Sequence, residues 1–212
     1  MARRVVGGES DSLTMEDWVA AARRAISEGG IGAVAVEPLA QSLGVTKGSF
    51  YWHFPNRGAL LRATLEQWEE EATGAVISAT EKVDDPRERL VRLVEEAFTG
   101  DPLGTRTSGR EVFLGHAFEL AVSDAADDPG VKPYLHRVSE RRIDYLQECY
   151  RALGISPEEA KYRALLAYAA YVGTLRLIRE APNRIPWGEE YHGYRQQLIS
   201  TLVPARDTGV SE

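Results

Sequence analysis

The sequence predicts an all-α protein with a small three-helix N-terminal domain followed by a larger helical domain. Apolar residues recur at helical spacing along most of the chain, and strand signals are few. Glycine and proline stand where helices must start or stop, as at Gly29, Pro86 and Gly154. These patterns indicate about nine helices. The apolar fraction of 43% over 212 residues is sufficient for a substantial core.

The first helix is predicted to start after Thr14, because Asp17 follows at the spacing of a capping box. Trp18, Val19, Ala22 and Ile26 then form one apolar face, and Gly29 and Gly30 end the helix.

Residues 39–57 form the most informative stretch, which reads as two short helices joined at Gly44. The first begins at Glu37 or Pro38, because proline is tolerated only in the first turn, and ends at about residue 43. The second is predicted from Thr46, its N-cap, through about Phe54. This is the layout of a helix-turn-helix, whose second helix enters the DNA major groove.

The remaining helices follow from similar signals. Asn56 caps a helix that reaches about residue 79, and Ser156 precedes Pro157 at another start. Further helices are predicted over about 86–98, 110–122, 131–153, 158–179 and 189–203.

Charge is distributed unevenly. The net charge is −7, yet residues 1–62 carry seven Lys/Arg against six Asp/Glu, so the acidic excess lies outside the helix-turn-helix. Arg3 and Arg4 lie in an expected flexible arm, where they could enter a minor groove or belong to a functionless tail.

Several protein classes are disfavoured. Cys149 is the only cysteine, which fits a reducing cytoplasm, and the apolar run 165–175 is too short to span a bilayer. We find no signal peptide and no catalytic or nucleotide-binding motif, and we expect no cofactor. Glu111, His116 and Glu119 share one predicted helix and could bind a metal, but a solvated helix face is the favoured interpretation, so no metal site is predicted.

The motif resembles the DNA-binding domain of the TetR (tetracycline repressor) family of bacterial regulators. The resemblance rests on Leu39-Ala40, Gly44 through Phe54, Asn56-Arg57 and Leu60-Leu61, and covers residues 14–65. Three departures are Pro38, Ala35-Val36 in place of a capping Ser or Thr, and Arg57 where lysine is common. The resemblance implies a flexible arm (1–13), a DNA-binding domain (14–62), an effector-binding and dimerisation domain (63–204) and a disordered tail (205–212).

It also implies particular roles for particular residues. Lys47 and Ser49 would lie nearest the bases, Trp52 would contact a thymine methyl, and Tyr51, His53 and Arg57 would contact the backbone. Partial burial is the alternative for Trp52. The expected DNA-binding residues are Thr46, Lys47, Gly48, Ser49, Tyr51, Trp52, His53 and Arg57.

The second domain is expected to hold an apolar or aromatic small molecule and to form a homodimer. The candidate ligand-binding residues are Phe98, Phe113, His116, Phe118, Tyr134, Tyr145, Tyr168 and Tyr171, for each of which an ordinary core role is the alternative. The candidate dimer residues are Leu165, Leu166, Ala169, Ala170, Val172, Gly173, Tyr191, Tyr194, Leu198 and Leu202, with intrachain packing as the alternative.

The sequence therefore predicts a cytoplasmic, ligand-responsive repressor that binds a palindromic operator as a homodimer. The alternatives are a helical adaptor that has lost DNA binding and a small helical enzyme.

Overall fold

The computed structural model describes residues 13–99, 109–186 and 189–205. Within these ranges the regular elements are helices, which confirms the all-α prediction. The expected N-terminal arm and C-terminal tail fall almost entirely outside them. The helices are α1 (Met15–Gly29), α2 (Val36–Ser42), α3 (Lys47–His53), α4 (Arg57–Glu69), α5 (Ala75–Thr80), α6 (Pro86–Thr99), α7 (Gly109–Asp124), α8 (Lys132–Ala152), α9 (Pro157–Glu180) and α10 (Glu189–Leu202).

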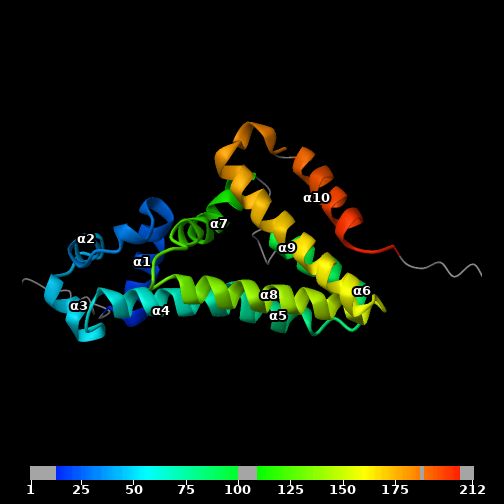
Figure 1. Ribbon diagram of the computed structural model, residues 1–212. Coiled ribbons are helices and arrows are strands. Elements are labelled where there is room, and N and C mark those ends of the chain that lie inside the picture. The colour runs from blue at the N-terminus through cyan, green and yellow to red at the C-terminus, as the bar shows by residue number, and fades with distance from the viewer. Residues whose placement is uncertain (1–12, 100–108, 187–188, 206–212) are drawn as a thin grey trace, which may run out of the picture.

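Figure 1 shows α1, α2 and α3 gathered at one end of the molecule. The helix formed by α4 and α5 runs beside α8 away from this end, and α6, α9 and α10 lie toward the other. Counted with α4 and α5 as one continuous helix, the described chain contains nine helices, as predicted.

The predicted helix starts depend on side-chain caps that the structure contains. The Thr14 hydroxyl accepts a hydrogen bond from the Asp17 N–H at 3.3 Å, and the Asp17 carboxylate accepts one from the Thr14 N–H at 2.8 Å. Asn56 caps α4 through the Ala59 N–H at 2.9 Å. Thr46 occupies the N-cap position of α3, but its side chain makes no capping hydrogen bond, which leaves its exposed hydroxyl available to a partner.

The turn of the helix-turn-helix depends on Gly44, whose φ of 70° lies in the left-handed region. Its N–H donates to the Gln41 carbonyl at 3.1 Å, and the Val45 N–H donates to the Ala40 carbonyl at 2.9 Å. These bonds close α2 and direct the chain into α3.

One feature of the α4–α5 helix was not predicted. Residues Glu70–Gly74 form a π-helical turn in its middle, so the helix is locally widened between the N-terminal helices and the second domain. Turns of this kind are rare and occur often at functional sites.

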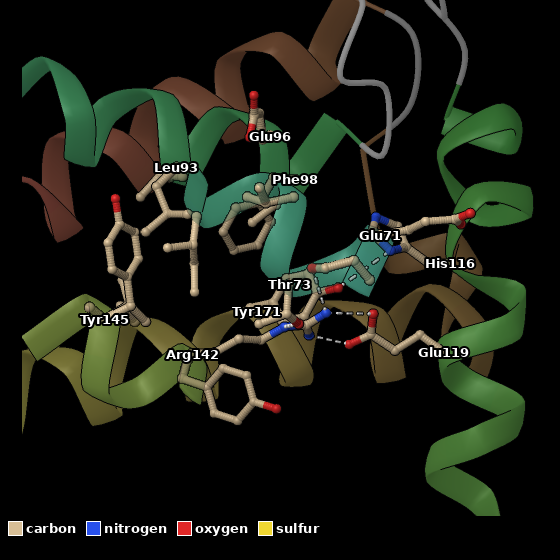
Figure 2. A pocket seen from close by; sticks show the side chains of 18 of the residues that line it. Glu71, Thr73, Leu93, Glu96, Phe98, His116, Glu119, Arg142, Tyr145 and Tyr171 are labelled. Carbon is tan, nitrogen blue, oxygen red and sulfur yellow. Dashed lines mark hydrogen bonds and ion pairs between the residues drawn. The ribbon is translucent and has the colours of Figure 1, made fainter. Parts of the chain in front are cut away.

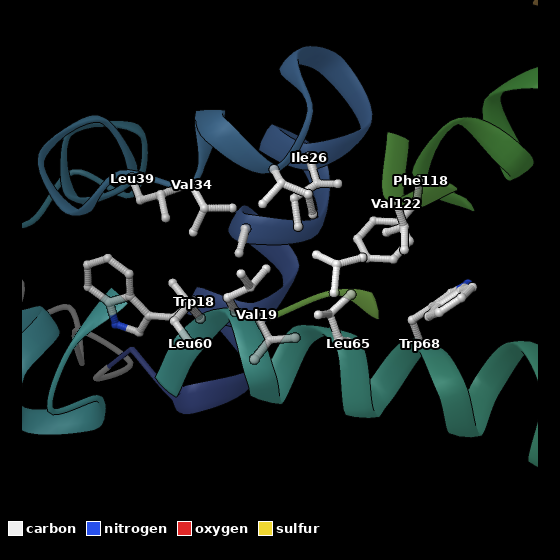
Figure 3. Close-up of a cluster of buried hydrophobic side chains, with 14 of the residues drawn as sticks. Trp18, Val19, Ile26, Val34, Leu39, Leu60, Leu65, Trp68, Phe118 and Val122 are labelled. Atoms are coloured by element: carbon white, nitrogen blue, oxygen red, sulfur yellow. The ribbon is translucent and has the colours of Figure 1, made fainter. Parts of the chain in front are cut away.

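The buried core of the N-terminal helices continues into the second domain. The Trp18 and Phe50 rings are 5.3 Å apart, edge to face, and hold α3 against α1. Figure 3 shows Phe118 and Val122 of α7 above Leu65 and Trp68 of α4, in the same cluster. A second cluster of buried residues lies between α6, α8, α9 and the end of α10. The first cluster contains residues on both sides of residue 62, the predicted boundary between the two domains. A movement of α7 would therefore displace the N-terminal helices through direct packing.

Candidate DNA-recognition surface and ligand cavity

Helix α3 presents a polar-aromatic face to solvent. Trp52 is 89% exposed and Tyr51 is 55% exposed, while Phe50 on the opposite face is fully buried. Thr46, Lys47 and Gly48 are also exposed, and Ser49 and His53 are half-buried. Seven of the eight residues expected to contact DNA therefore lie on α3 or at its start, and the eighth, Arg57, begins α4. The alternative of a partly buried Trp52 is wrong.

Two of these residues already have partners in the protein. The Lys47 ammonium lies 2.7 Å from the Glu37 carboxylate of α2, and both side chains are exposed. This hydrogen bond and charge lower the pKa of Glu37 and raise that of Lys47. An exposed pair of this kind contributes little to stability, so it can open when a phosphate or base competes for the lysine.

Arg57 has a structural role that the sequence did not reveal. Its Nε donates to the Val34 carbonyl at 2.6 Å, and its Nη2 donates to the Ile31 carbonyl at 2.7 Å. These bonds fasten the start of α4 to the segment between α1 and α2. Arg57 is 23 residues from Val34 and 26 from Ile31, so no local sequence pattern predicts these contacts.

A cavity of about 340 Å³ lies between the π-turn, α6, α7, α8 and α9. Its wall is mainly apolar and aromatic, and its volume is at the lower end of the range for small-molecule pockets, which is about 300–1,000 Å³. Six of the eight residues predicted to bind a ligand line it: Phe98, His116, Phe118, Tyr145, Tyr168 and Tyr171. The side chain of Phe113 is outside the described residues.

Tyr134 does not line the cavity, so the prediction that it binds the ligand is wrong. Its ring lies under the Arg137 guanidinium, 4.4 Å away, and its hydroxyl donates to Glu66 at 3.3 Å. It belongs to the core that joins α4 to α8. The apolar periodicity of α8 shows that Tyr134 faces inward, but it does not show whether the side chain enters the core or the cavity.

One end of the cavity is polar, which the sequence did not predict. Figure 2 shows Arg142 of α8 between Thr73 of the π-turn and Glu119 of α7. The guanidinium donates to the Glu119 carboxylate at 2.5 Å, to the Thr73 hydroxyl at 3.0 Å and to the Ala72 carbonyl at 3.1 Å. Arg142 thus ties two walls of the cavity to the π-turn.

This ion pair is buried, with side-chain exposures of 14% for Arg142 and 11% for Glu119. Burial by itself would raise the pKa of Glu119, but the charge and hydrogen bonds of Arg142 hold it below its usual value. Burial would likewise lower the pKa of Arg142, and the Glu119 charge raises it instead. Both groups are therefore charged at neutral pH.

His116 completes the polar end. Its Nδ1 lies 3.4 Å from the Tyr171 hydroxyl, and its Nε2 is buried with no hydrogen-bond partner among the described residues. Burial is the largest effect on His116 and lowers its pKa. The Glu119 charge raises the pKa by less, and the Arg142 charge lowers it further. The imidazole is therefore neutral at physiological pH, and one of its polar atoms is available to a ligand.

Helix α9 presents an apolar face to solvent. Leu165, Leu166 and Val172 are 47%, 61% and 41% exposed. Tyr162 and Leu177 extend the same face toward its two ends, and Ala169 and Gly173 lie along its centre. An exposed patch of this composition is typical of a protein–protein interface.

Comparison with known proteins agrees with this geometry. The profile of the bacterial regulatory proteins of the tetR family matches residues 19–64, which include α2, α3 and most of α1 and α4. The chain belongs to the TetR family.

Individual relatives extend the similarity beyond the DNA-binding domain. The chain is 26% identical over 159 residues to the HTH-type transcriptional regulator TtgR of Pseudomonas putida, which covers 74% of this chain and 70% of that protein. The structure of a transcriptional regulator from Rhodococcus sp. Rha1 superposes with a TM-score of 0.70 at 19% identity, covering 90% of this chain and 94% of that one. The multidrug-binding protein EbrR, solved with malachite green, superposes with a TM-score of 0.61 at 21% identity, covering 90% and 98%.

As a TetR-family protein, the chain is a DNA-binding transcriptional regulator and not an enzyme. No helix in the described part of the chain is long and apolar enough to cross a membrane. Among the described residues no cluster of potential metal ligands is found, and Glu119 is bound to Arg142.

The structure corrects part of the predicted TetR-family dimer surface. Tyr191 and Leu202 of α10 are buried inside the chain at 7% and 5% exposure. The Tyr191 hydroxyl donates to the Phe98 carbonyl at 2.5 Å, and Tyr194 bonds the Thr174 hydroxyl at 2.9 Å. Leu198 packs on the second core. Tyr191 and Leu202 therefore point inward and Tyr194 and Leu198 are half-buried, whereas the exposed apolar face belongs to α9.

Proposed function

We propose that this TetR-family chain is a repressor that binds a palindromic operator as a homodimer and leaves it when a small molecule occupies the cavity. The single observation that carries the proposal is the exposed polar-aromatic face of α3. A tryptophan that is 89% exposed on a short helix, next to an exposed tyrosine, favours a surface that is covered by a partner.

In the proposed complex α3 enters the major groove. Lys47 and Ser49, at the helix start, lie nearest the base edges, and Trp52 contacts a thymine methyl. Tyr51, His53 and the exposed Thr46 contact the phosphate backbone, and Gly48 allows close approach. Arg57 acts mainly by fixing the start of α4, through its bonds to the Val34 and Ile31 carbonyls.

The exposed face of α9 supports the proposed dimer. In a two-fold assembly Leu165, Leu166, Ala169 and Val172 would pack against the same residues of a second copy, with Ala170 and Gly173 allowing close helix approach. The α3 helices of the two copies would then lie one helical turn of DNA apart, about 34–36 Å, and would bind the two halves of a palindrome. We place this activity in the cytoplasm, where such a regulator meets DNA.

The π-turn and Arg142 support the proposed release by a ligand. Arg142 lines the cavity and bonds the π-turn, and Glu71 of that turn pairs with Arg23 of α1. A ligand that shifts the π-turn would therefore displace α1 and α4 relative to each other. The structure of EbrR with malachite green supports a small-molecule site in a protein of this fold.

The proposal is tested by fluorescence anisotropy with an operator, on the full chain and on the Lys47→Ala, Tyr51→Ala double variant. Because both side chains are exposed on α3, the variant should fold and dimerise normally but lose operator binding. The affinity of the unaltered chain should fall steeply as salt rises, since phosphate contacts release counterions. Operator binding that survives the double substitution would contradict the assignment of α3.

A further inference from the structure

We infer that the cavity recognises uncharged, hydroxylated aromatic compounds of the phenol class, and that His116 selects them by a hydrogen bond to the ligand hydroxyl. The inference rests on the proposed function, because it names the ligand class of the same cavity. Three features of the described lining lead to it: its aromatic walls, its neutralised charges and one buried polar atom.

The walls favour a flat apolar body. The Tyr171 ring lies at the centre of an aromatic group, 6.0 Å from Phe98 at an angle of 84° and 6.3 Å from Tyr168. Trp68 and Phe118 add a second pair of rings, 5.9 Å apart. Aromatic side chains bind a planar ligand through stacked and edge-to-face contacts.

The charges of the lining disfavour an anion. Arg142 is bound to Glu119, and Arg23 is bound to Glu71. An anionic ligand that took the place of either carboxylate would leave that carboxylate without its cation. For a pair as buried as Arg142 and Glu119 this is strongly unfavourable.

A cation is disfavoured as well. It gains little from Glu71 and Glu119, because each carboxylate is already satisfied by its arginine. Glu96 is the third carboxyl of the lining, and burial raises its pKa, so its negative charge is less favourable there than in water. An uncharged ligand therefore fits this lining best.

His116 Nε2 is a buried polar atom of the cavity lining with no hydrogen-bond partner among the described residues. Its pKa shift keeps the ring neutral, so Nε2 is either a donor or an acceptor, depending on the tautomer. If Tyr171 donates to Nδ1, Nε2 carries the proton, and if Tyr171 accepts from Nδ1, Nε2 is an acceptor. A hydroxyl group matches both cases, because it donates and accepts. A buried polar atom without a partner is costly, so a ligand that supplies one is favoured over an apolar analogue.

The test uses four probes of one shape with the full-length protein: 4-phenylphenol, biphenyl, biphenyl-4-carboxylate and 4-phenylbenzylammonium. Isothermal titration calorimetry at neutral pH measures each affinity. We expect 4-phenylphenol to bind about tenfold more tightly than biphenyl, the effect of one hydrogen bond, and to bind more tightly than either charged probe.

Variants then locate the selectivity. His116→Phe keeps a ring but removes both nitrogens, so 4-phenylphenol and biphenyl should bind it equally. His116→Gln keeps a donor and an acceptor and should retain the preference for the phenol. Tyr134→Phe removes a hydroxyl outside the cavity and should leave all four affinities unchanged. Thermal melts monitored by circular dichroism confirm that each variant is folded.

The inference is overturned if the carboxylate or the ammonium binds most tightly, or if the phenol preference survives His116→Phe. Absence of 4-phenylphenol binding up to about 1 mM would overturn it as well. Operator binding, measured on the same preparations without a probe, separates the two proposals. If the protein binds its operator but ranks the probes differently, only the ligand class is wrong. If it does not bind DNA, the proposed function fails.

Discussion

Trp52 and Phe50 stand two residues apart on α3 and have opposite environments, 89% exposed and fully buried. Phe50 therefore serves the fold, and Trp52 is free to serve recognition. Phe50 holds α3 against Trp18, whereas Trp52 adds little to the fold because water already surrounds it.

Replacing Trp52 by alanine should therefore affect DNA binding and not stability. We expect Trp52→Ala to weaken operator binding about tenfold, through the loss of an apolar base contact. Its free energy of unfolding should change by no more than about 0.5 kcal/mol. Urea denaturation and fluorescence anisotropy measure the two quantities. A clear loss of stability would show that Trp52 packs within the protein.

His116 predicts a particular pH dependence of stability. Its pKa in the folded protein is lowered from about 6.5, so below that pH the unfolded chain binds a proton that the folded chain does not. Stability should therefore fall as pH decreases through about 6.5. His116→Gln should remove this part of the pH dependence. Thermal melts across this range, compared between the two proteins, measure it. An identical pH profile for both would contradict a neutral buried His116.

Some of these residues could be predicted from sequence and others could not. Thr14, Asn56 and Ser156 are confirmed as N-caps because capping depends on neighbours within three residues. Arg142 was missed because its partners Thr73 and Glu119 are 69 and 23 residues away. A charged residue on a long helix is usually solvated, so nothing local indicated its burial.

At the scale of elements, the π-turn Glu70–Gly74 is where the cavity meets the DNA-reading end. Its Thr73 and Ala72 are held by Arg142, and its Glu71 pairs with Arg23. The apolar periodicity of residues 57–80 correctly predicted one long helix. It did not predict the π-turn, because the widening leaves the overall apolar pattern helical.

The ion pair beside this turn should be costly to break on one side only. Arg142→Ala leaves the Glu119 carboxylate buried without its cation, so we expect a loss of about 3–5 kcal/mol in the free energy of unfolding. The double variant Arg142→Met, Glu119→Leu removes both charges and should be more stable than Arg142→Ala. Urea denaturation compares them. A double variant that is less stable than Arg142→Ala would show that the two side chains act independently.

At the scale of the whole molecule, the apolar face of α9 sets the proposed assembly. The sequence correctly indicated that α9 is apolar on most sides, and it placed several α9 residues at the dimer surface. It could not decide which face of α10 points inward, because Tyr191, Tyr194, Leu198 and Leu202 have the same apolar character that an interface requires. In the structure α10 packs against α6, and Tyr191 is buried against Ile178 and Ile185, which fixes the inward face of α10.

Leu166→Glu tests that assembly. A carboxylate at the centre of a two-fold interface faces its own copy, so we expect the variant to be a folded monomer with much weaker operator binding. Met15→Glu is the matched control, because Met15 is 49% exposed on α1 and gains the same charge away from α9. Analytical ultracentrifugation measures both. A Leu166→Glu protein that remains dimeric would remove α9 from the interface.

The most direct test of the account is selection of binding sites from random duplex DNA by the full chain without ligand. Sequencing of the retained DNA should recover a palindrome whose half-sites are centred about 10–10.5 base pairs apart, or a multiple of one helical turn. Recovery of no enriched sequence, or of a single half-site without a symmetric partner, would contradict a dimeric regulator that reads DNA through α3.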